Sequence, residues 1–265
     1  MTESPARGSR QTIWDDDAAL AALVNLVAVL ADNKYYFGRA LSEWAVGAPT
    51  MEDAVGCAAI AQEELGHCRA LYPLLNQLPF EGGPTPLERG GERRRRYCVS
   101  YLDDPLSTWP QLVAALLLVD TAMLVLIESL VGSSYDNLAS RVRRMPGEER
   151  FHADFAEGRV REITDFERGI EELRVEVDRL LPEMLCWFGP PGEPGVGILK
   201  EKSLISADNE EMRQSYLSRI GPLLTDEGID VAMLRRHSGE SWEYADLPWD
   251  RWNRLQRRLT TAPAS

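Results

Sequence analysis

Apolar residues recur at helical spacing through most of the chain, and no stretch competes with them by the two-residue alternation of a strand. The long periodic runs cover about residues 18–46, 51–76, 108–131, 135–162 and 165–187. Breaks rich in glycine and proline separate them, so that the first four runs form two hairpins. The pattern predicts an all-α protein built on a four-helix bundle, with additional helices towards the C-terminus.

Local signals refine this outline. Three aspartates, residues 15–17, complement the dipole at the start of the first helix, and Thr50 is suited to cap the second. A proline- and glycine-rich loop, 79–92, precedes a shorter predicted helix at 93–102. Pro146-Gly147 should interrupt the fourth long run, because proline removes a backbone hydrogen bond.

Composition divides the chain into three predicted parts. Residues 1–12 are polar and rich in Ser, Arg and Gly, which predicts a disordered tail. Residues 13–188 hold the long runs and form the predicted bundle. Residues 189–265 begin with a glycine- and proline-rich linker and contain weaker helical patterns at 208–224 and 226–237, which predicts a helical extension packed on the bundle.

Charge and cysteine content narrow the classes of function. The formal net charge of −13 argues against nucleic acid as a partner, because phosphate binding needs a basic surface. The four cysteines form no CxxC pair, which disfavours a zinc ribbon or a redox dithiol. The N-terminus lacks the apolar core of a signal peptide, and the longest apolar run, 112–119, is too short to span a membrane. We therefore expect a cytoplasmic protein that binds neither nucleic acid nor membrane.

The most informative motif is a repeated Glu-x-x-His. Glu64 and His67 form one copy, Glu149 and His152 form the other, and the chain has only three histidines. Residues i and i+3 share a helix face, so each copy offers a carboxylate and an imidazole to one metal ion. Two such helices that face each other hold a metal pair in the di-iron and di-manganese carboxylate bundles.

Hairpin geometry locates the two further carboxylates that such a bundle requires. Residues at equal distance from the turn between two antiparallel helices lie at the same height. Reflecting Glu64 through the first turn gives Asp32. Reflecting Glu149 through the second turn gives position 117, less than one turn from Asp120. A lone carboxylate at Asp120 is costly in so apolar a run unless it is paired or coordinated.

Four other glutamates compete with or support this assignment. Glu43 lies about three turns beyond Asp32 on the first helix, so the two cannot bind one cluster and Glu43 is its rival. Glu128 is the rival of Asp120 and lies about two turns nearer the second break. Glu63 and Glu148 directly precede the motif glutamates and point about a quarter turn away. We interpret these two as solvent-facing or supporting groups.

This combination of ligands indicates oxygen chemistry. Carboxylates with one imidazole per metal suit iron or manganese, and open coordination positions suit dioxygen. We expect two iron ions, with manganese as the alternative, dioxygen as co-substrate, and Glu64 and Glu149 as the catalytic carboxylates. No flavin, nicotinamide or iron–sulfur motif is visible, so electrons would come from a separate reductase. The predicted metal ligands are Asp32, Glu64, His67, Asp120, Glu149 and His152.

Several of these segments resemble the phenylacetic acid catabolic proteins, the ferritin-like subunits of the bacterial phenylacetyl-coenzyme A epoxidase. The resemblance in the first helix lies in Leu30-Ala31-Asp32-Asn33 and Leu41-Ser42-Glu43-Trp44. It continues through Ala48-Pro49 and residues 59–75, and Leu118-Val119-Asp120 resembles the third-helix ligand of the catalytic subunit. The two Glu-x-x-His motifs resemble the paired ligands of that subunit.

That family contains a catalytic di-iron subunit and a related partner subunit that has lost the metal. The first helix here is most similar to the partner type, whereas the ligands resemble the catalytic type, in which the first helix carries a glutamate that has no secure counterpart here. The resemblance implies a ferritin-like di-iron monooxygenase of a small organic substrate, such as a coenzyme A thioester, in a homo- or hetero-oligomer of related subunits. The alternatives are a non-catalytic partner subunit and a ferritin- or rubrerythrin-like handler of metal or peroxide.

Overall fold

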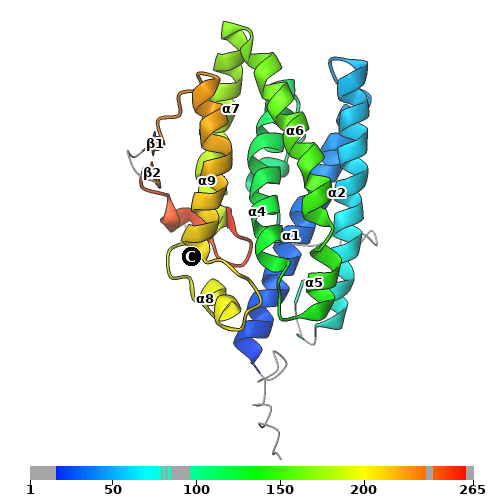
Figure 1. The fold of residues 1–265 in the computed structure, drawn as a ribbon, viewed down its shortest axis with the longest axis vertical. Coiled ribbons are helices and arrows are strands. Elements are labelled where there is room, and N and C mark those ends of the chain that lie inside the picture. The colour runs from blue at the N-terminus through cyan, green and yellow to red at the C-terminus, as the bar shows by residue number, and fades with distance from the viewer. Residues whose placement is uncertain (1–15, 79, 81–82, 85–95, 237–240, 261–265) are drawn as a thin grey trace, which may run out of the picture.

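Long helices lie side by side along one direction, which confirms the predicted all-α bundle (Figure 1). The first hairpin is α1 with α2, and the second joins the α3–α4 run to α6 through α5. The computed structural model describes residues 16–78, 80, 83–84, 96–236 and 241–260. Its principal helices are α1 (Asp17–Trp44), α2 (Met51–Gln77), α3 (Trp109–Ala115), α4 (Thr121–Leu130), α5 (Asp136–Val142), α6 (Met145–Thr164) and α7 (Glu167–Trp187).

The third long helix changes its winding beside the site. Thr108 and Gln111 form a capping box where α3 begins. The next five residues, Leu116–Asp120 (η3), are π-helical and lead directly into α4. A π-helical turn holds more residues than an α-helical one, so it shifts the register of the residues beyond it.

Pro146 starts a helix instead of kinking one. The helix is interrupted between Val142, where α5 ends, and Met145, where α6 begins. Pro146 lies in the first turn of α6. Proline is tolerated there because the first backbone N–H groups of a helix have no intrahelical acceptor. Glu149 and His152 follow within the same regular helix, so the proline leaves the spacing of the second motif intact.

By length and composition alone, two helical runs among the described residues could cross a membrane: Asp17–Trp44 and Trp109–Leu130. In the structure, 72% and 83% of their most apolar windows are buried inside the bundle. Their apolar residues therefore form the core, as in the central helices of a soluble protein.

The described C-terminal residues depart from the predicted pair of helices. The first prediction matches α9 (Asn209–Asp226). The second, at 226–237, is wrong, because Gly228 adopts a φ of +69° and ends α9. Glycine accepts this left-handed conformation without strain and commonly terminates helices in this way. The chain continues into a short antiparallel hairpin of β1 (Leu234–Arg236) and β2 (Trp242–Tyr244).

Other short elements complete the described chain. The predicted linker contains a helix, α8, and within the predicted helix 93–102 the described residues are helical only in the 3-10 turn η2. Glu183 of α7 accepts hydrogen bonds from the backbone N–H groups of Ser100 (2.8 Å) and Leu259 (3.2 Å), which ties the last strand to the bundle. The elements are η2 (Ser100–Leu102), α8 (Pro194–Glu201), η4 (Trp249–Arg251), β3 (Trp252–Asn253) and β4 (Arg258–Leu259). The predicted tail, 1–12, lies outside the described residues.

Candidate functional site

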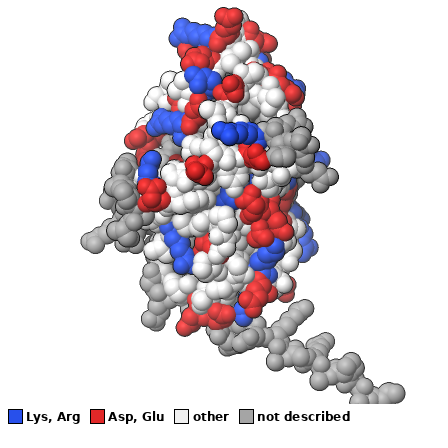
Figure 2. Space-filling model, turned by 90° about the vertical axis from the view of Figure 1, so that its left-hand side faces the viewer, with Lys and Arg blue, Asp and Glu red and all other residues white. Residues whose placement is uncertain are grey.

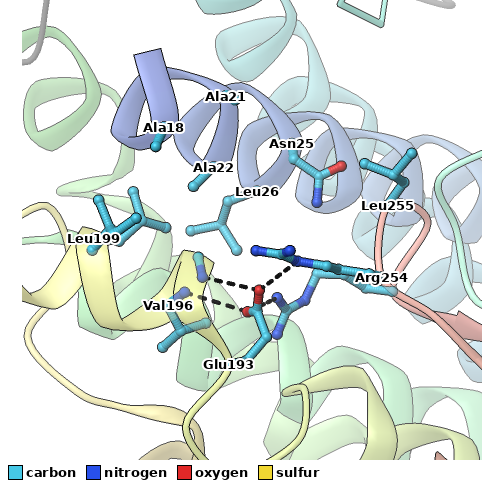
Figure 3. A pocket seen from close by; sticks show the side chains of 13 residues that line it. Ala18, Ala21, Ala22, Asn25, Leu26, Glu193, Val196, Leu199, Arg254 and Leu255 are labelled. Atoms are coloured by element: carbon cyan, nitrogen blue, oxygen red, sulfur yellow. Dashed lines mark hydrogen bonds and ion pairs between the residues drawn. The ribbon is translucent and has the colours of Figure 1, made fainter. Parts of the chain in front are cut away.

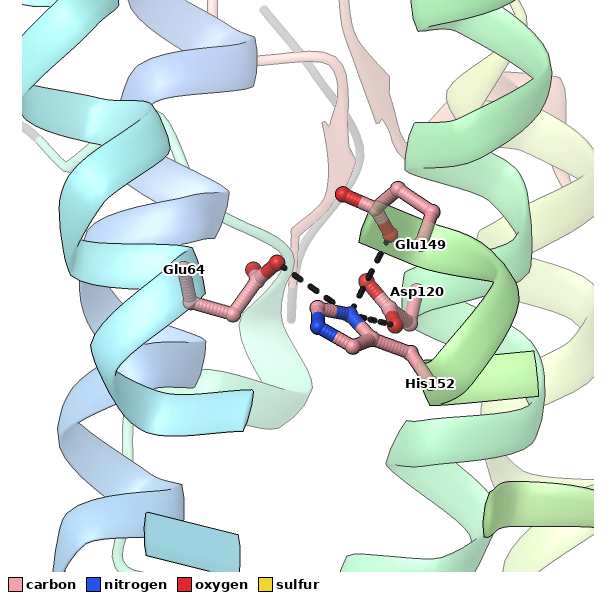
Figure 4. Close-up of side chains that lie close together, drawn as sticks. All are labelled: Glu64, Asp120, Glu149 and His152. Atoms are coloured by element: carbon pink, nitrogen blue, oxygen red, sulfur yellow. Dashed lines mark hydrogen bonds and ion pairs between the residues drawn. The ribbon is translucent and has the colours of Figure 1, made fainter. Parts of the chain in front are cut away.

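Five of the six predicted ligands lie together in the middle of the bundle, and Figure 4 shows four of them. Glu64 and His67 extend from α2, Asp120 from the end of η3, and Glu149 and His152 from α6. All five are at most 4% exposed. One ligand atom from each of the four residues in Figure 4 lies within 4.8 Å of the others. The fold therefore brings distant carboxylates and imidazoles into one buried cluster.

Both histidines turn Nδ1 towards the carboxylates. Nδ1 of His152 lies 2.9 Å from Asp120 and 3.3 Å from Glu149. Nδ1 of His67 lies 3.2 Å from Glu149 and 3.6 Å from Glu64. The two imidazole rings thus approach the same group of carboxylates, one from α2 and one from α6.

The outer nitrogens of the histidines are held by a crossed pair of glutamates. Nε2 of His67 on α2 lies 2.7 Å from Glu148 on α6, and Nε2 of His152 on α6 lies 2.7 Å from Glu63 on α2. Each motif therefore supplies the carboxylate that orients the histidine of the other. Of the two interpretations given for Glu63 and Glu148, the supporting role matches this geometry.

Asp32, the sixth predicted ligand, does not join the cluster. Its carboxylate accepts hydrogen bonds from the Tyr72 hydroxyl and the Tyr97 backbone N–H, both at 2.9 Å. The adjacent Asn33 accepts a hydrogen bond from the Val99 N–H at 3.0 Å. These two residues thus fasten the chain that follows the 79–92 loop onto α1. Reflection through a hairpin turn gives the height of a residue along the helix axis but not the helix face on which it lies. The reflection therefore selected Asp32, which lies at the right height but on another face.

Lys34 takes the place on α1 that was predicted for Asp32. Its Nζ atom lies 2.5 Å from Glu64 and 3.1 Å from Asp120, and it also donates to Glu149. The Lys34 side chain is fully buried. An ammonium group has three N–H bonds, and here each carboxylate that it meets comes from a different helical run. One positive charge therefore connects α1 with the other three sides of the bundle.

The carboxylates hold these basic groups in their charged forms. Burial alone would lower the pKa of Lys34, but the three neighbouring negative charges raise it above its ordinary value. Burial also opposes the charged imidazoles, yet the adjacent carboxylates raise the pKa to about 9 at His67 and to about 11 at His152. For Glu149, burial raises the pKa, but Lys34 and the histidines outweigh it and bring the pKa well below its ordinary value. For Glu64, burial and the neighbouring acidic groups outweigh Lys34 and raise the pKa above its ordinary value. Lys34, His67 and His152 are thus charged at neutral pH, and all three lie beside the central carboxyl groups.

The whole sequence is similar to one protein family. The family model described as phenylacetic acid catabolic protein matches residues 2–261. The chain belongs to this family. Comparison with curated proteins gives no match. Membership of the phenylacetic acid catabolic proteins supports an oxygenase-type role in phenylacetate catabolism, and the buried cluster of carboxylates and histidines is compatible with that role.

In this family member, the central cation conflicts with a pair of iron ions. The donor types suit iron, and two buried atoms, Oε2 of Glu64 and Nδ1 of His67, have no hydrogen-bond partner among the described residues. However, the Lys34 ammonium contacts all three central carboxylates at once, and these are the carboxylates that would have to hold the ions. A fixed positive charge there repels a divalent cation. The residues present therefore do not fit a di-iron pair while Lys34 remains in the cluster.

Lys34 has a sequence signal that points to a buried ion pair. It is the only basic residue between Asp17 and Gly38, in a helix whose other residues there are largely apolar. Lysine is almost never fully buried unless it is paired. A lysine at the height of two Glu-x-x-His motifs therefore indicates a buried ion pair as readily as the neighbouring aspartate indicates a metal ligand.

Lys34→Met tests the central ion pairs. The substitution removes the charge and leaves the buried carboxylates without the cation between them. We expect the free energy of unfolding to fall by about 3–5 kcal/mol, as when one partner of a buried pair is removed. Chemical denaturation at neutral pH measures this change. Lys200→Met, which breaks surface ion pairs with Asp208 and Glu211, is the control and should lower the free energy of unfolding far less, because solvent screens these pairs. A loss at Lys34 as small as the control's would contradict the geometry.

Asp32→Ala tests the structural assignment of that residue. The variant leaves the Tyr97 N–H and the Tyr72 hydroxyl without this acceptor, so we expect it to lose about 1–3 kcal/mol of stability. Amide hydrogen exchange at Tyr97 and Val99 should become faster than in the wild type. Exchange in α6 should change no more than the loss of global stability accounts for. Unchanged exchange at both amides would show that Asp32 does not fasten this segment.

Proposed function

We propose that this chain is a metal-free partner subunit in an oxygenase assembly of the phenylacetic acid catabolic family. The observation that carries the proposal is the position of the Lys34 ammonium between Glu64, Asp120 and Glu149. A lysine from α1 stands where a di-metal bundle requires a fourth carboxylate. Its charge balances buried acids that would otherwise need metal ions for their stability.

As a partner subunit, the chain would bind and stabilise a related, metal-bearing subunit. Its first helix supports this role through residues 30–33 and 41–44, which resemble the partner type of the family. The family match over residues 2–261 supports a subunit of that fold. We place it in the cytoplasm, which accords with its four buried, free cysteines.

A di-iron monooxygenase is the second candidate, and the histidine geometry favours it. Nδ1 of each histidine faces the cluster while Nε2 is held by Glu63 or Glu148, an arrangement that orients metal-ligating histidines in many proteins. The ions would supply dioxygen chemistry on an organic substrate such as a coenzyme A thioester, with electrons from a separate reductase. This function requires Lys34 to leave the cluster. The ligands would be Glu64, His67, Asp120, Glu149 and His152.

Metal loading of the wild-type protein distinguishes the two candidates. The purified chain is incubated with Fe(II) under anaerobic conditions, or with Mn(II), desalted, and analysed for metal and for Tm. We expect well under one ion per chain and an unchanged Tm, because Lys34 already compensates the buried carboxylates. Stoichiometric binding of either metal with a rise in Tm would reject the metal-free role and favour the monooxygenase.

Lys34→Glu should convert the cluster into a metal site. It replaces the ammonium by a fourth carboxylate and completes the four-carboxylate, two-histidine set of di-metal bundles. Without metal, repulsion among the buried acids should make the variant less stable than the wild type. With Fe(II) or Mn(II) it should bind about two ions per chain and regain stability.

Lys34→Met provides the matched control for this gain of binding, because it removes the charge without adding a ligand. We expect it to bind less metal than Lys34→Glu. If Lys34→Glu binds no more metal than the wild type, then Lys34 is not the residue that excludes metal from this cluster.

A further inference from the structure

A separate cavity lies between the first turns of α1, helix α8 and the turn that joins β3 to β4 (Figure 3). Its volume is about 280 Å³. Its walls are mainly apolar and include Ala22 and Leu26 of α1 and Val196 and Leu199 of α8. Binding sites for small molecules are typically concave and mostly apolar, with a few polar groups that fix orientation. This cavity has such polar groups at one end.

A buried carboxylate organises the polar end. Glu193 is 5% exposed, and its two oxygens accept four hydrogen bonds. Two come from the backbone N–H groups of Gly195 (3.1 Å) and Val196 (3.3 Å) at the start of α8. The other two come from Nε of Arg254 (3.0 Å) and Nη1 of Arg257 (3.3 Å). Glu193 is therefore saturated and has no need of a further donor.

Among the described residues that line the cavity, this end carries one positive charge in excess. Two guanidinium groups, those of Arg254 and Arg257, face the single carboxylate of Glu193. Arg257 is buried and is also fixed by its hydrogen bond to the Trp187 carbonyl (2.9 Å). This local excess stands out in a chain whose net charge is −13.

Arg254 is the group that remains available to a ligand. Only its Nε is engaged by a partner among the described residues, which leaves the terminal N–H groups of its guanidinium for another acceptor. Figure 3 shows this guanidinium between Glu193 and the α1 wall, on the side where the Asn25 amide also lies. A planar guanidinium recognises a carboxylate through two parallel hydrogen bonds.

We propose that this cavity binds a small organic monocarboxylate with an apolar body. The carboxylate lies on the terminal nitrogens of Arg254 and near the Asn25 amide, and the apolar body lies against Ala22, Leu26 and Leu199. One negative charge matches the one excess positive charge. A neutral molecule of the same shape would fill the apolar part but leave the guanidinium without its acceptor.

Titration calorimetry with octanoate and phenylacetate, each paired with its uncharged primary amide, tests the proposal. We expect saturable one-to-one binding of at least one acid, about tenfold or more tighter than its amide, because a charged hydrogen bond contributes more than one factor of ten in affinity. Amide NMR shifts should be confined to α1, α8 and residues 254–257. No saturable binding of either acid at millimolar concentration, or equal affinity for acid and amide, would overturn the proposal.

Three variants locate the binding. Arg254→Gln should weaken binding of the acid by about tenfold or more, and Ala22→Leu should abolish it by filling the cavity. Arg168→Gln, which changes an exposed arginine on α7, is the control and should bind like the wild type. Wild-type affinity in both cavity variants would place any bound acid elsewhere and reject this site. Circular dichroism and Tm confirm that each variant is folded before titration.

Discussion

One buried ammonium group joins the helices of this bundle. Lys34 reaches from α1 to carboxylates on α2, η3 and α6, and none of these groups is stable in the core without the others. The two histidines depend on the same carboxylates through Nδ1, and the outer glutamates hold the histidines through Nε2. The centre of the protein is thus a single network of charges, in which removing the lysine would affect every other member. Acidic and basic side chains are also interspersed on the face drawn in Figure 2. The central carboxylates and histidines differ from those surface charges because they are at most 4% exposed.

If the chain is the metal-free partner that we propose, this arrangement explains how a fold of this family can be stable without metal. In a di-metal bundle, the charge of the ions compensates the buried carboxylates. Here a lysine side chain provides positive charge, and the contacts of its ammonium group with three carboxylates link the helices. The retained Glu-x-x-His motifs then have a structural use, because their crossed contacts connect α2 with α6.

Much of the bundle is predictable from hydrophobic periodicity, because apolar stripes this long can be buried only by packing helices together. The repeated motif and the hairpin reflection predict six ligands, and five of these lie in the cluster. The reflection failed at Asp32 because it gives no direction around the helix. The hairpin of β1 and β2 was missed because α9 ends at Gly228, which adopts a left-handed conformation. The amino-acid composition alone does not show which glycine will adopt it. The π-helical turn at η3 was also missed, because hydrophobic periodicity predicts a helix without distinguishing its winding.

The most direct test of the account is anomalous X-ray diffraction from crystals of the wild-type protein grown with excess Mn(II). The account predicts no anomalous density among Glu64, Asp120 and Glu149, and continuous side-chain density that places the Lys34 ammonium within hydrogen-bonding distance of all three carboxylates. An anomalous peak between these carboxylates, with the Lys34 side chain turned out of the cluster, would contradict it.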